Sequence, residues 1–128
     1  VMVGLEQSGD TRIVPVDLHR RFLPFVEDVL PQLLPGYEKF LVADPSGKIN
    51  ISEACSNLGG RFLLAIGPEG GWVDFELKKF KAIGGCICTL GERILKVDTA
   101  VISLHSQIMA VSSLPPYRYK QEESRTSC

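Results

Sequence analysis

Two apolar runs that each end in a glycine-bearing loop restrict the fold more than any other feature of the chain. Residues 62–66 (Phe-Leu-Leu-Ala-Ile) lead into Gly-Pro-Glu-Gly-Gly at 67–71, and residues 86–90 lead into a second loop at 91–96. The first run lacks polar alternation, which is typical of a strand buried on both faces of a parallel sheet. A helix-like segment separates the two runs, as a parallel crossover requires. Because ligands bind outside the carboxyl ends of such strands, we expect both loops to line one pocket.

The rest of the chain continues this alternation of strands and helices. Short apolar segments predict strands, and the full set of expected strands is 12–16, 39–43, 61–67 and 86–90. Apolar residues at helical spacing predict helices at 18–34, 51–58, 74–83 and 97–114. This order indicates an α/β fold with a mostly parallel sheet and helices on both faces. We expect one domain over residues 1–116 and a polar, disordered tail over 117–128.

Individual residues are expected to break, begin or orient these elements. Pro15 confines residues 12–16 to an edge strand or an extended link, and Pro24 and Pro31 interrupt the first helix. Ser52 and Asp74 are candidate N-caps of the second and third helices. One apolar stripe on the last helix is expected to face the core, and its members are Val97, Ala100, Val101, Leu104, Ile108 and Val111.

Charge and composition narrow the classes of function. The net charge of the 128 residues is −1, which gives no electrostatic signature of nucleic-acid binding. No apolar run approaches the roughly 20 residues of a membrane span, and the first residues show no signal-peptide pattern. Cys86 and Cys88 share a strand face, where two small apolar core side chains are favoured over a metal site. Reduced thiols favour an intracellular location, which leaves the cytoplasm, mitochondrion or plastid open.

The residues of the two loops leave alternatives open. No Walker A motif and no GxGxxG motif is present, so the glycine loop at 67–71 is either a ligand-binding loop or a plain turn. Glu69 is either a pocket carboxylate or a solvated turn residue, and Trp72 either packs against the core or offers a stacking face. Arg93 either binds a phosphate or carboxylate of a ligand or forms a surface pair with a neighbouring acid.

The last helix raises the question of self-association. Leu104 and Met109 belong to apolar positions that continue beyond what one sheet face needs. These side chains either meet a symmetry-related copy of the chain or complete an ordinary core helix.

Taken together, these motifs resemble one family. Ile-Gly-Pro-Glu-Gly-Gly, then a helix, then Leu-Gly-x-Arg-Ile-Leu followed by a basic residue, an acid, Thr and Ala, is similar to the ribosomal RNA small subunit methyltransferase E (RsmE) family. The segment from Gly4-Leu5-Glu6-Gln7-Ser8 to Pro15 shares the resemblance. It implies the SPOUT class of methyltransferases, with a trefoil knot in the C-terminal part. It also implies S-adenosylmethionine as methyl donor, transfer to N3 of a uridine in small-subunit (16S-type) ribosomal RNA, and a homodimer.

The resemblance also assigns roles to residues of the two loops. Arg93 is the expected catalytic residue, and Glu69 is a weaker candidate for a general base. No metal and no membrane is implied. The cofactor-binding positions that match the family motifs are Ile66, Gly67, Gly70, Gly71, Leu90, Gly91, Ile94 and Leu95.

The chain also departs from the family pattern. The small basic β-barrel that usually precedes this domain is absent, and so is the opening strand–helix–strand, so we expect a chain truncated at its N-terminus. Lys96 and Asp98 replace an expected Arg and Glu. The alternative function is therefore a non-catalytic cofactor-binding or dimerisation remnant of the same fold, and an unrelated nucleotide-binding α/β module is a third possibility.

Overall fold

Four parallel strands form the sheet of this computed structural model, which describes residues 13, 15–56, 59–91 and 96–111. The strands are β1 (Lys39–Ala43), β2 (Ile49–Asn50), β3 (Phe62–Ile66) and β4 (Cys86–Thr89), and their order across the sheet is β2-β4-β1-β3. The helical segments are α2 (Phe22–Pro24), η1 (Phe25–Val29), α3 (Leu30–Leu33), η2 (Leu34–Gly36), α4 (Ile51–Ala54), α5 (Asp74–Ala82) and α6 (Val97–Val111).

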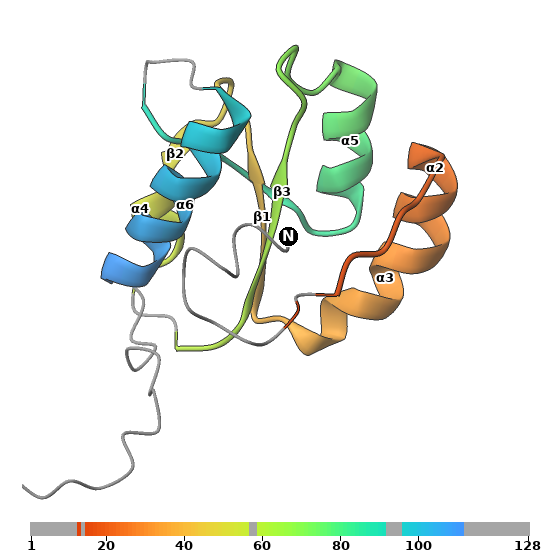
Figure 1. The fold of residues 1–128 in the computed structure, drawn as a ribbon, viewed down its shortest axis with the longest axis horizontal. Helices are drawn as coiled ribbons and strands as arrows, with labels where there is room; N and C mark the ends of the chain where they lie inside the picture. Colours follow the sequence, from red (N-terminus) through yellow and green to blue (C-terminus); the bar gives the residue numbers. More distant parts are fainter. Residues whose placement is uncertain (1–12, 14, 57–58, 92–95, 112–128) are drawn as a thin grey trace, which may run out of the picture.

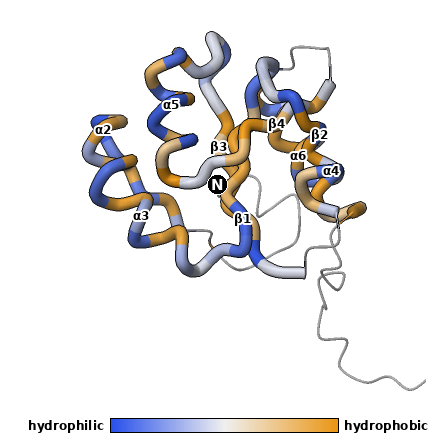
Figure 2. Tube along the Cα trace, turned by 180° about the vertical axis from the view of Figure 1, so that it is seen from behind, coloured by the Kyte–Doolittle hydropathy of each residue, from blue (hydrophilic) through white to orange (hydrophobic). Residues whose placement is uncertain are grey.

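The helices cover both faces of the sheet (Figure 1). One face carries the helical segment from α2 to α3 together with α5, and the other carries α4 and α6. Strand β1 contributes side chains to both layers. Leu41 packs towards α4 and α6, whereas Phe40 and Val42 pack towards α5 and α3. In Figure 2 the tube is mainly hydrophobic along β3 and β4. The prediction of an α/β fold with a parallel sheet and helices on both faces is therefore confirmed.

Strand β3 lies at the edge of the described sheet. It pairs with β1 over its whole length, from Lys39 opposite Phe62 to Ala43 opposite Ile66. Both of its faces are covered, since Phe62, Leu64 and Ile66 pack against one core cluster and Leu63 and Ala65 against the other, but all five residues are half-buried and not fully buried as expected. The physical reason is that β3 has one neighbouring strand among the described residues, whereas β1 has two and buries Leu41 and Val42 completely.

The proline-rich segment is helical, but its hydrogen-bonding pattern changes along its length. It begins at Phe22 rather than at residue 18, because Leu18 is 90% exposed and makes no helical turn. Pro24 lies in the first turn, where the missing N–H is tolerated. The turn before Pro31 widens into a π-helix, in which the N–H of Leu30 donates to the carbonyl of Phe25. The predicted interruption by the prolines is thus confirmed as a change of helix type.

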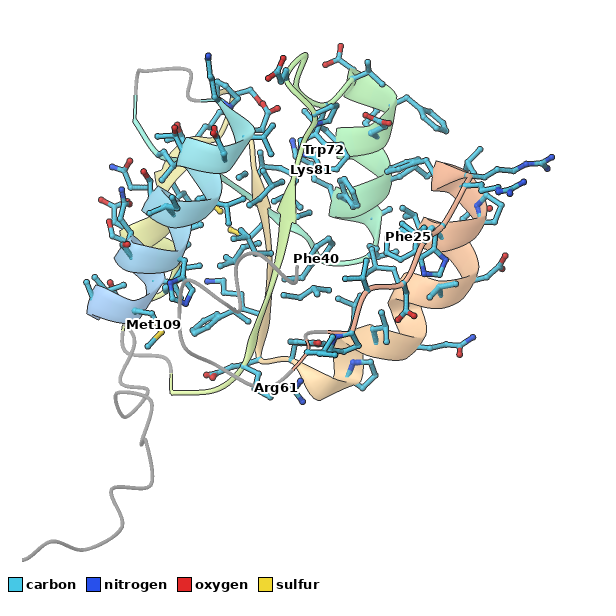
Figure 3. The ribbon with its side chains drawn as sticks, in the orientation of Figure 1. Phe25, Phe40, Arg61, Trp72, Lys81 and Met109 are labelled. Carbon is cyan, nitrogen blue, oxygen red and sulfur yellow. The ribbon has the colours of Figure 1, made fainter. Side chains whose placement is uncertain are left out.

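Aromatic side chains fill the layer between this segment, α5 and the sheet (Figure 3). The Phe80 ring meets those of Phe22, Phe40 and Trp72 edge to face, at centroid distances of 5.3, 5.5 and 4.9 Å. Edge-to-face pairs add to the stabilisation that comes from burying apolar area. This cluster connects the residue after the 67–71 loop, Trp72, to the middle of the sheet.

Three predictions about the ends of elements are wrong. The described residues of 12–16 form no strand, and Ile13 and Val16 are 66% and 62% exposed because no neighbouring strand pairs with them. Ser52 lies inside α4, which begins after Asn50 and extends as helix only to Ala54. Asp74 is the first residue of α5 rather than its N-cap, because the N–H of Val73 is satisfied by the Glu76 carboxylate, at 3.0 Å.

Helix α6 presents a narrower apolar face to the core than the sequence indicates. Leu104 and Ile108 are buried, but Val101 is 45% exposed, so it does not belong to the core stripe. Leu104 has no exposed surface and cannot meet another copy of the chain, whereas Val101 and Ile102 lie on the outside of α6. Residues 112–116 of the expected domain and the tail at 117–128 lie outside the described residues.

The cysteines of β4 behave as apolar residues of the α4–α6 core, as the sequence predicts. Cys88 is fully buried beside Cys55, and its thiol donates to the carbonyls of Cys86 and Val42, at 3.3 and 3.8 Å. Burial raises the pKa of Cys88 to about 12 and also raises the pKa of Cys55. Because the thiolate is the reactive form, these two thiols are unreactive at neutral pH.

This burial predicts the order in which the thiols are alkylated. With iodoacetamide at about pH 8.5, a value near the pKa of a free thiol, we expect Cys88 and Cys55 of the folded chain to stay unmodified. Both should react once urea unfolds the chain and restores their ordinary pKa values. Peptide mapping by mass spectrometry gives the modified fraction at each site. Rapid native alkylation of Cys88 would contradict the packing described for β4.

Candidate functional site

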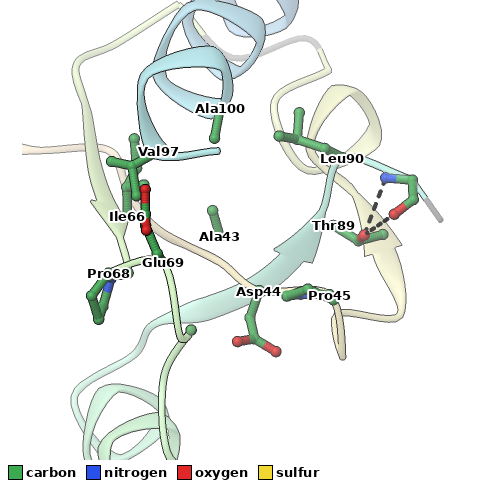
Figure 4. A pocket seen from close by; sticks show the side chains of 13 residues that line it. Ala43, Asp44, Pro45, Ile66, Pro68, Glu69, Thr89, Leu90, Val97 and Ala100 are labelled. Atoms are coloured by element: carbon green, nitrogen blue, oxygen red, sulfur yellow. Dashed lines mark hydrogen bonds between the residues drawn. The ribbon is translucent and has the colours of Figure 1, made fainter. Parts of the chain in front are cut away.

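A pocket opens at the carboxyl ends of β1, β3 and β4, beside the N-terminal turn of α6 (Figure 4). Parallel pairing brings these strand ends to the same edge of the sheet. The pocket's water-accessible core measures about 90 Å³, within an open depression of about 600 Å³. Its described lining consists of Ala43, Asp44, Pro45, Ile66, Gly67, Pro68, Glu69, Gly71, Thr89, Leu90, Gly91, Val97 and Ala100.

The loop after β3 forms one wall of the pocket. Its turn is closed by the N–H of Gly71, which donates to the carbonyl of Pro68 at 2.8 Å. Gly71 has a φ of +74°, a left-handed conformation that glycine adopts without steric cost. The indole of Trp72 packs under Gly67, where an added Cβ would lie 3.2 Å from the ring. Of the two roles considered for Trp72, packing against the core is the one that the structure shows.

The end of β4 forms a second wall. The Thr89 hydroxyl accepts a hydrogen bond from the Gly91 N–H at 3.1 Å and donates to the Gly91 carbonyl at 3.0 Å. This local ring bends the chain as it leaves the sheet, and Leu90 lines the pocket at that bend. Residues 92–95 lie outside the described residues, and with them the predicted site residues Arg93, Ile94 and Leu95.

A third wall comes from the turn after β1, which sequence reasoning did not assign to the site. The Asp44 N–H donates to the Cys88 carbonyl at 3.0 Å, and the Gly47 N–H donates to the Asp44 carbonyl at 3.0 Å. Gly47 packs so closely on β4 that an added Cβ would lie 2.5 Å from the Cys88 carbonyl carbon. In the sequence, Asp-Pro-Ser-Gly directly follows the apolar run at 39–43, a pattern that indicates a turn but does not by itself indicate a site residue.

Most of the predicted site residues meet at this pocket. Ile66, Gly67, Gly71, Leu90 and Gly91 line it, and so does the exposed Glu69. Gly70 does not line it, because it lies on the outer side of the turn with open space around it. Sequence reasoning missed the two α6 side chains, Val97 and Ala100.

The chemistry of the described lining is simple. It offers main-chain N–H and C=O groups of two loops, small apolar side chains, and the two carboxylates of Asp44 and Glu69. Within the described part of the chain, no Lys, Arg or His lines the pocket, and no group of three metal-ligating side chains is found. The described helices include none with the length and apolarity needed to span a membrane.

Comparison with known proteins places this chain in a family. The family model for an RNA methyltransferase domain matches residues 1–109, which include the whole described pocket. The chain belongs to this RNA methyltransferase family. The resemblance drawn from the two glycine loops is thereby confirmed, since the curated relatives carry the name ribosomal RNA small subunit methyltransferase E.

Two of these relatives show the extent of the match. The Synechocystis protein is 45% identical over 112 residues, which cover 87% of this chain and 36% of that protein. The Bacillus subtilis protein is 33% identical over 102 residues, which cover 70% of this chain and 40% of that protein. The chain therefore spans well under half the length of these two curated relatives.

Solved structures agree with the fold. A Legionella pneumophila protein described as a methyltransferase in complex with the cofactor SAM matches with a TM-score of 0.65 and 25% identity, over 85% of this chain and 43% of that one. Ribosomal RNA small subunit methyltransferase E from Neisseria gonorrhoeae matches with a TM-score of 0.57 and 23% identity, over 85% and 43% of the two chains. The trefoil knot expected in the C-terminal part stays a prediction.

The contrast between the two last glycines of the 67–71 loop gives a test of its geometry. Gly71→Ala forces a Cβ into the left-handed region and should destabilise the chain by roughly 1–2 kcal/mol. Gly70→Ala is the matched control, because an added Cβ there meets nothing within 4 Å and the backbone is not left-handed. Urea denaturation followed by circular dichroism measures both. Equal effects of the two substitutions would contradict the described turn.

Proposed function

We propose that this chain is the cofactor-binding part of an S-adenosylmethionine-dependent RNA methyltransferase that methylates N3 of a uridine in small-subunit ribosomal RNA. The observation that carries the proposal is the meeting of two glycine loops at the carboxyl ends of parallel strands, with their main-chain groups facing one pocket. The family match and the SAM complex of the Legionella relative support the same ligand.

The residues of the pocket suit a purine nucleoside. Main-chain N–H and C=O groups in the two loops can read the polar edge of an adenine, and Leu90, Val97 and Ala100 offer apolar contact to its faces. The enclosed part of about 90 Å³ is smaller than the roughly 300–1,000 Å³ of typical ligand pockets, so much of the ligand would occupy the open depression. Ile94 and Leu95, which the family motif adds to the cofactor site, follow directly on this wall in the sequence.

The methyl donor supplies an electrophilic methyl group bonded to a sulfonium. The uracil N3 carries a proton that must leave before or during the transfer, so negative charge develops on the base. The Arg93 guanidinium is the proposed catalytic group, because a cation beside the uracil stabilises that charge. The Glu69 carboxylate lines the pocket and is exposed, and it is the candidate acceptor of the proton.

A second candidate function is a non-catalytic cofactor-binding or dimerisation module of the same fold. One observation favours it: the net charge of −1 provides no general attraction for RNA. A cofactor-binding module requires the same pocket as the enzyme and differs only in that it transfers no methyl group, whereas a dimerisation module does not require the pocket.

We also propose that the chain forms a homodimer through the outer face of α6. Val101 and Ile102 are adjacent on that face and are 45% and 69% exposed, although both are apolar. Apolar side chains that stay exposed side by side are candidates for an interface between copies. Small-subunit ribosomal RNA is the further proposed partner.

Cofactor binding is tested with the single tryptophan of the chain. Because the Trp72 indole touches Gly67 of the pocket loop, titration with S-adenosylhomocysteine should change its fluorescence and saturate. Isothermal titration calorimetry should return the same affinity. Absence of binding at about 1 mM ligand, a free energy weaker than about −4 kcal/mol, would reject the enzyme and the cofactor-binding module and leave only a dimerisation module.

Methyl transfer then separates the two candidates. If the chain is the enzyme, tritiated methyl groups from S-adenosylmethionine should appear in small-subunit ribosomal RNA, and Arg93→Ala should lower the rate about 10²-fold. Arg20→Ala, which removes an exposed arginine outside the pocket, is the matched control. Ligand binding without any transfer would establish the non-catalytic alternative.

The dimer is tested by analytical ultracentrifugation. The wild-type chain should sediment at twice its mass of 14.1 kDa. Ile102→Glu should give a monomer, because it places a charge in the apolar interface. Leu33→Glu, a similar change at a 44% exposed position on α3, should remain a dimer. A wild-type chain that remains a monomer at high concentration would contradict the proposed interface.

A further inference from the structure

Asp44 is a carboxylate that the fold holds in place at the pocket. Its residue is 9% exposed, which makes it the one buried charged residue of the described chain. The oxygen Oδ1 accepts hydrogen bonds from the N–H and the hydroxyl of Ser46, at 2.9 and 2.6 Å. Two donors on one oxygen fix the plane of the carboxylate and keep the side chain from rotating away.

The second oxygen of Asp44 faces the other loop of the pocket. Oδ2 lies 4.0 Å from the position that a Cβ on Gly71 would take, and no donor from the described part of the chain bonds to it. A carboxylate oxygen that no donor of the protein bonds is available to a ligand or to water. Oδ2 is therefore placed to interact with whatever enters between the loops of Asp44 and Gly71.

The charge of the described lining has one sign. Asp44 and Glu69 extend from separate loops around the pocket (Figure 4), and no basic side chain of the described residues joins them. Low-dielectric walls and a single sign of charge focus the field on the ligand. The two carboxylates of the described lining therefore favour a ligand group with positive charge between these loops.

We infer that Asp44 is a specificity residue that makes the pocket prefer the positively charged S-adenosylmethionine over the neutral S-adenosylhomocysteine. The inference rests on the proposed function and adds a determinant that the family motifs do not include. During transfer the S–CH₃ bond breaks and its electron pair stays on sulfur, which becomes a neutral thioether, while N3 of the uracil bonds the methyl carbon and gives up its proton. The reaction therefore removes the charge that Asp44 attracts, and the product dissociates more readily than the substrate.

The size of the expected preference follows from the attraction between the carboxylate of Asp44 and the sulfonium. At an effective dielectric constant of about 20, the attraction between two unit charges inside one small pocket corresponds to at least a tenfold change in affinity. Part of it is screened, because the depression is open to solvent. We therefore expect the wild-type chain to bind S-adenosylmethionine about tenfold more tightly than S-adenosylhomocysteine.

The test compares both ligands on the full chain by isothermal titration calorimetry. Asp44→Asn keeps an oxygen for the Ser46 donors and removes the charge, so it should weaken S-adenosylmethionine about tenfold and S-adenosylhomocysteine by much less. Asp28→Asn, the same change at an exposed position on the α3 side of the sheet, should leave both affinities unchanged. Raising the salt concentration should reduce the wild-type preference.

The possible results distinguish the inference about Asp44 from the proposed function on which it rests. Equal affinity of the wild-type chain for the two ligands overturns the inference and leaves the proposed function standing, as does an equal loss of both ligands in Asp44→Asn. Binding of neither ligand to the wild-type chain rejects both. If Asp44→Asn does not fold, Glu69→Gln at the exposed second carboxylate is measured instead: loss of the preference in this variant, or a wild-type preference that salt does not reduce, overturns the inference.

Discussion

The central position of β1 is the constraint on which the rest of the structure depends. It pairs in parallel with β3 on one side and β4 on the other, and it buries Leu41 and Val42 completely between two helical layers. Because all three strands run the same way, their carboxyl ends meet at one edge of the sheet. The three loops that leave this edge then form the pocket, so the site is a consequence of strand direction more than of any single side chain.

The sequence predicts the parts of the site that rest on local patterns. Glycines after an apolar run indicate a loop that can approach a ligand, and Gly67 and Gly71 do line the pocket. It does not predict which strand occupies the edge, because the run at 62–66 is equally apolar in either position. Strand order depends on contacts between distant residues, such as Ala43 with Cys88, which no local pattern contains.

Asp44 is a second feature of the site that the local sequence does not predict. Its turn was evident from Asp-Pro-Ser-Gly, but its burial was not, since an aspartate in a turn is ordinarily exposed. Two tertiary features bury it: the hydrogen bond from its N–H to Cys88, and the close packing of Gly47 on β4. The same features place its free oxygen towards Gly71, so a functional role emerges only when the strands are assembled.

A second hollow of about 460 Å³ between α2 and β3 provides a physical contrast with the site. Its lining includes Phe22, Phe25, Trp72 and Phe80, and the strand edge beside it has no further strand among the described residues. Most of that lining is apolar, and its directional groups are the side chains of His19 and Arg21 and the partnerless Nε1 of Trp72, none of which carries negative charge. The pocket at the strand ends combines main-chain donors and acceptors with one oriented carboxylate. A sulfonium needs a nearby negative charge, so of these two hollows the strand-end pocket is the one that suits the proposed reaction.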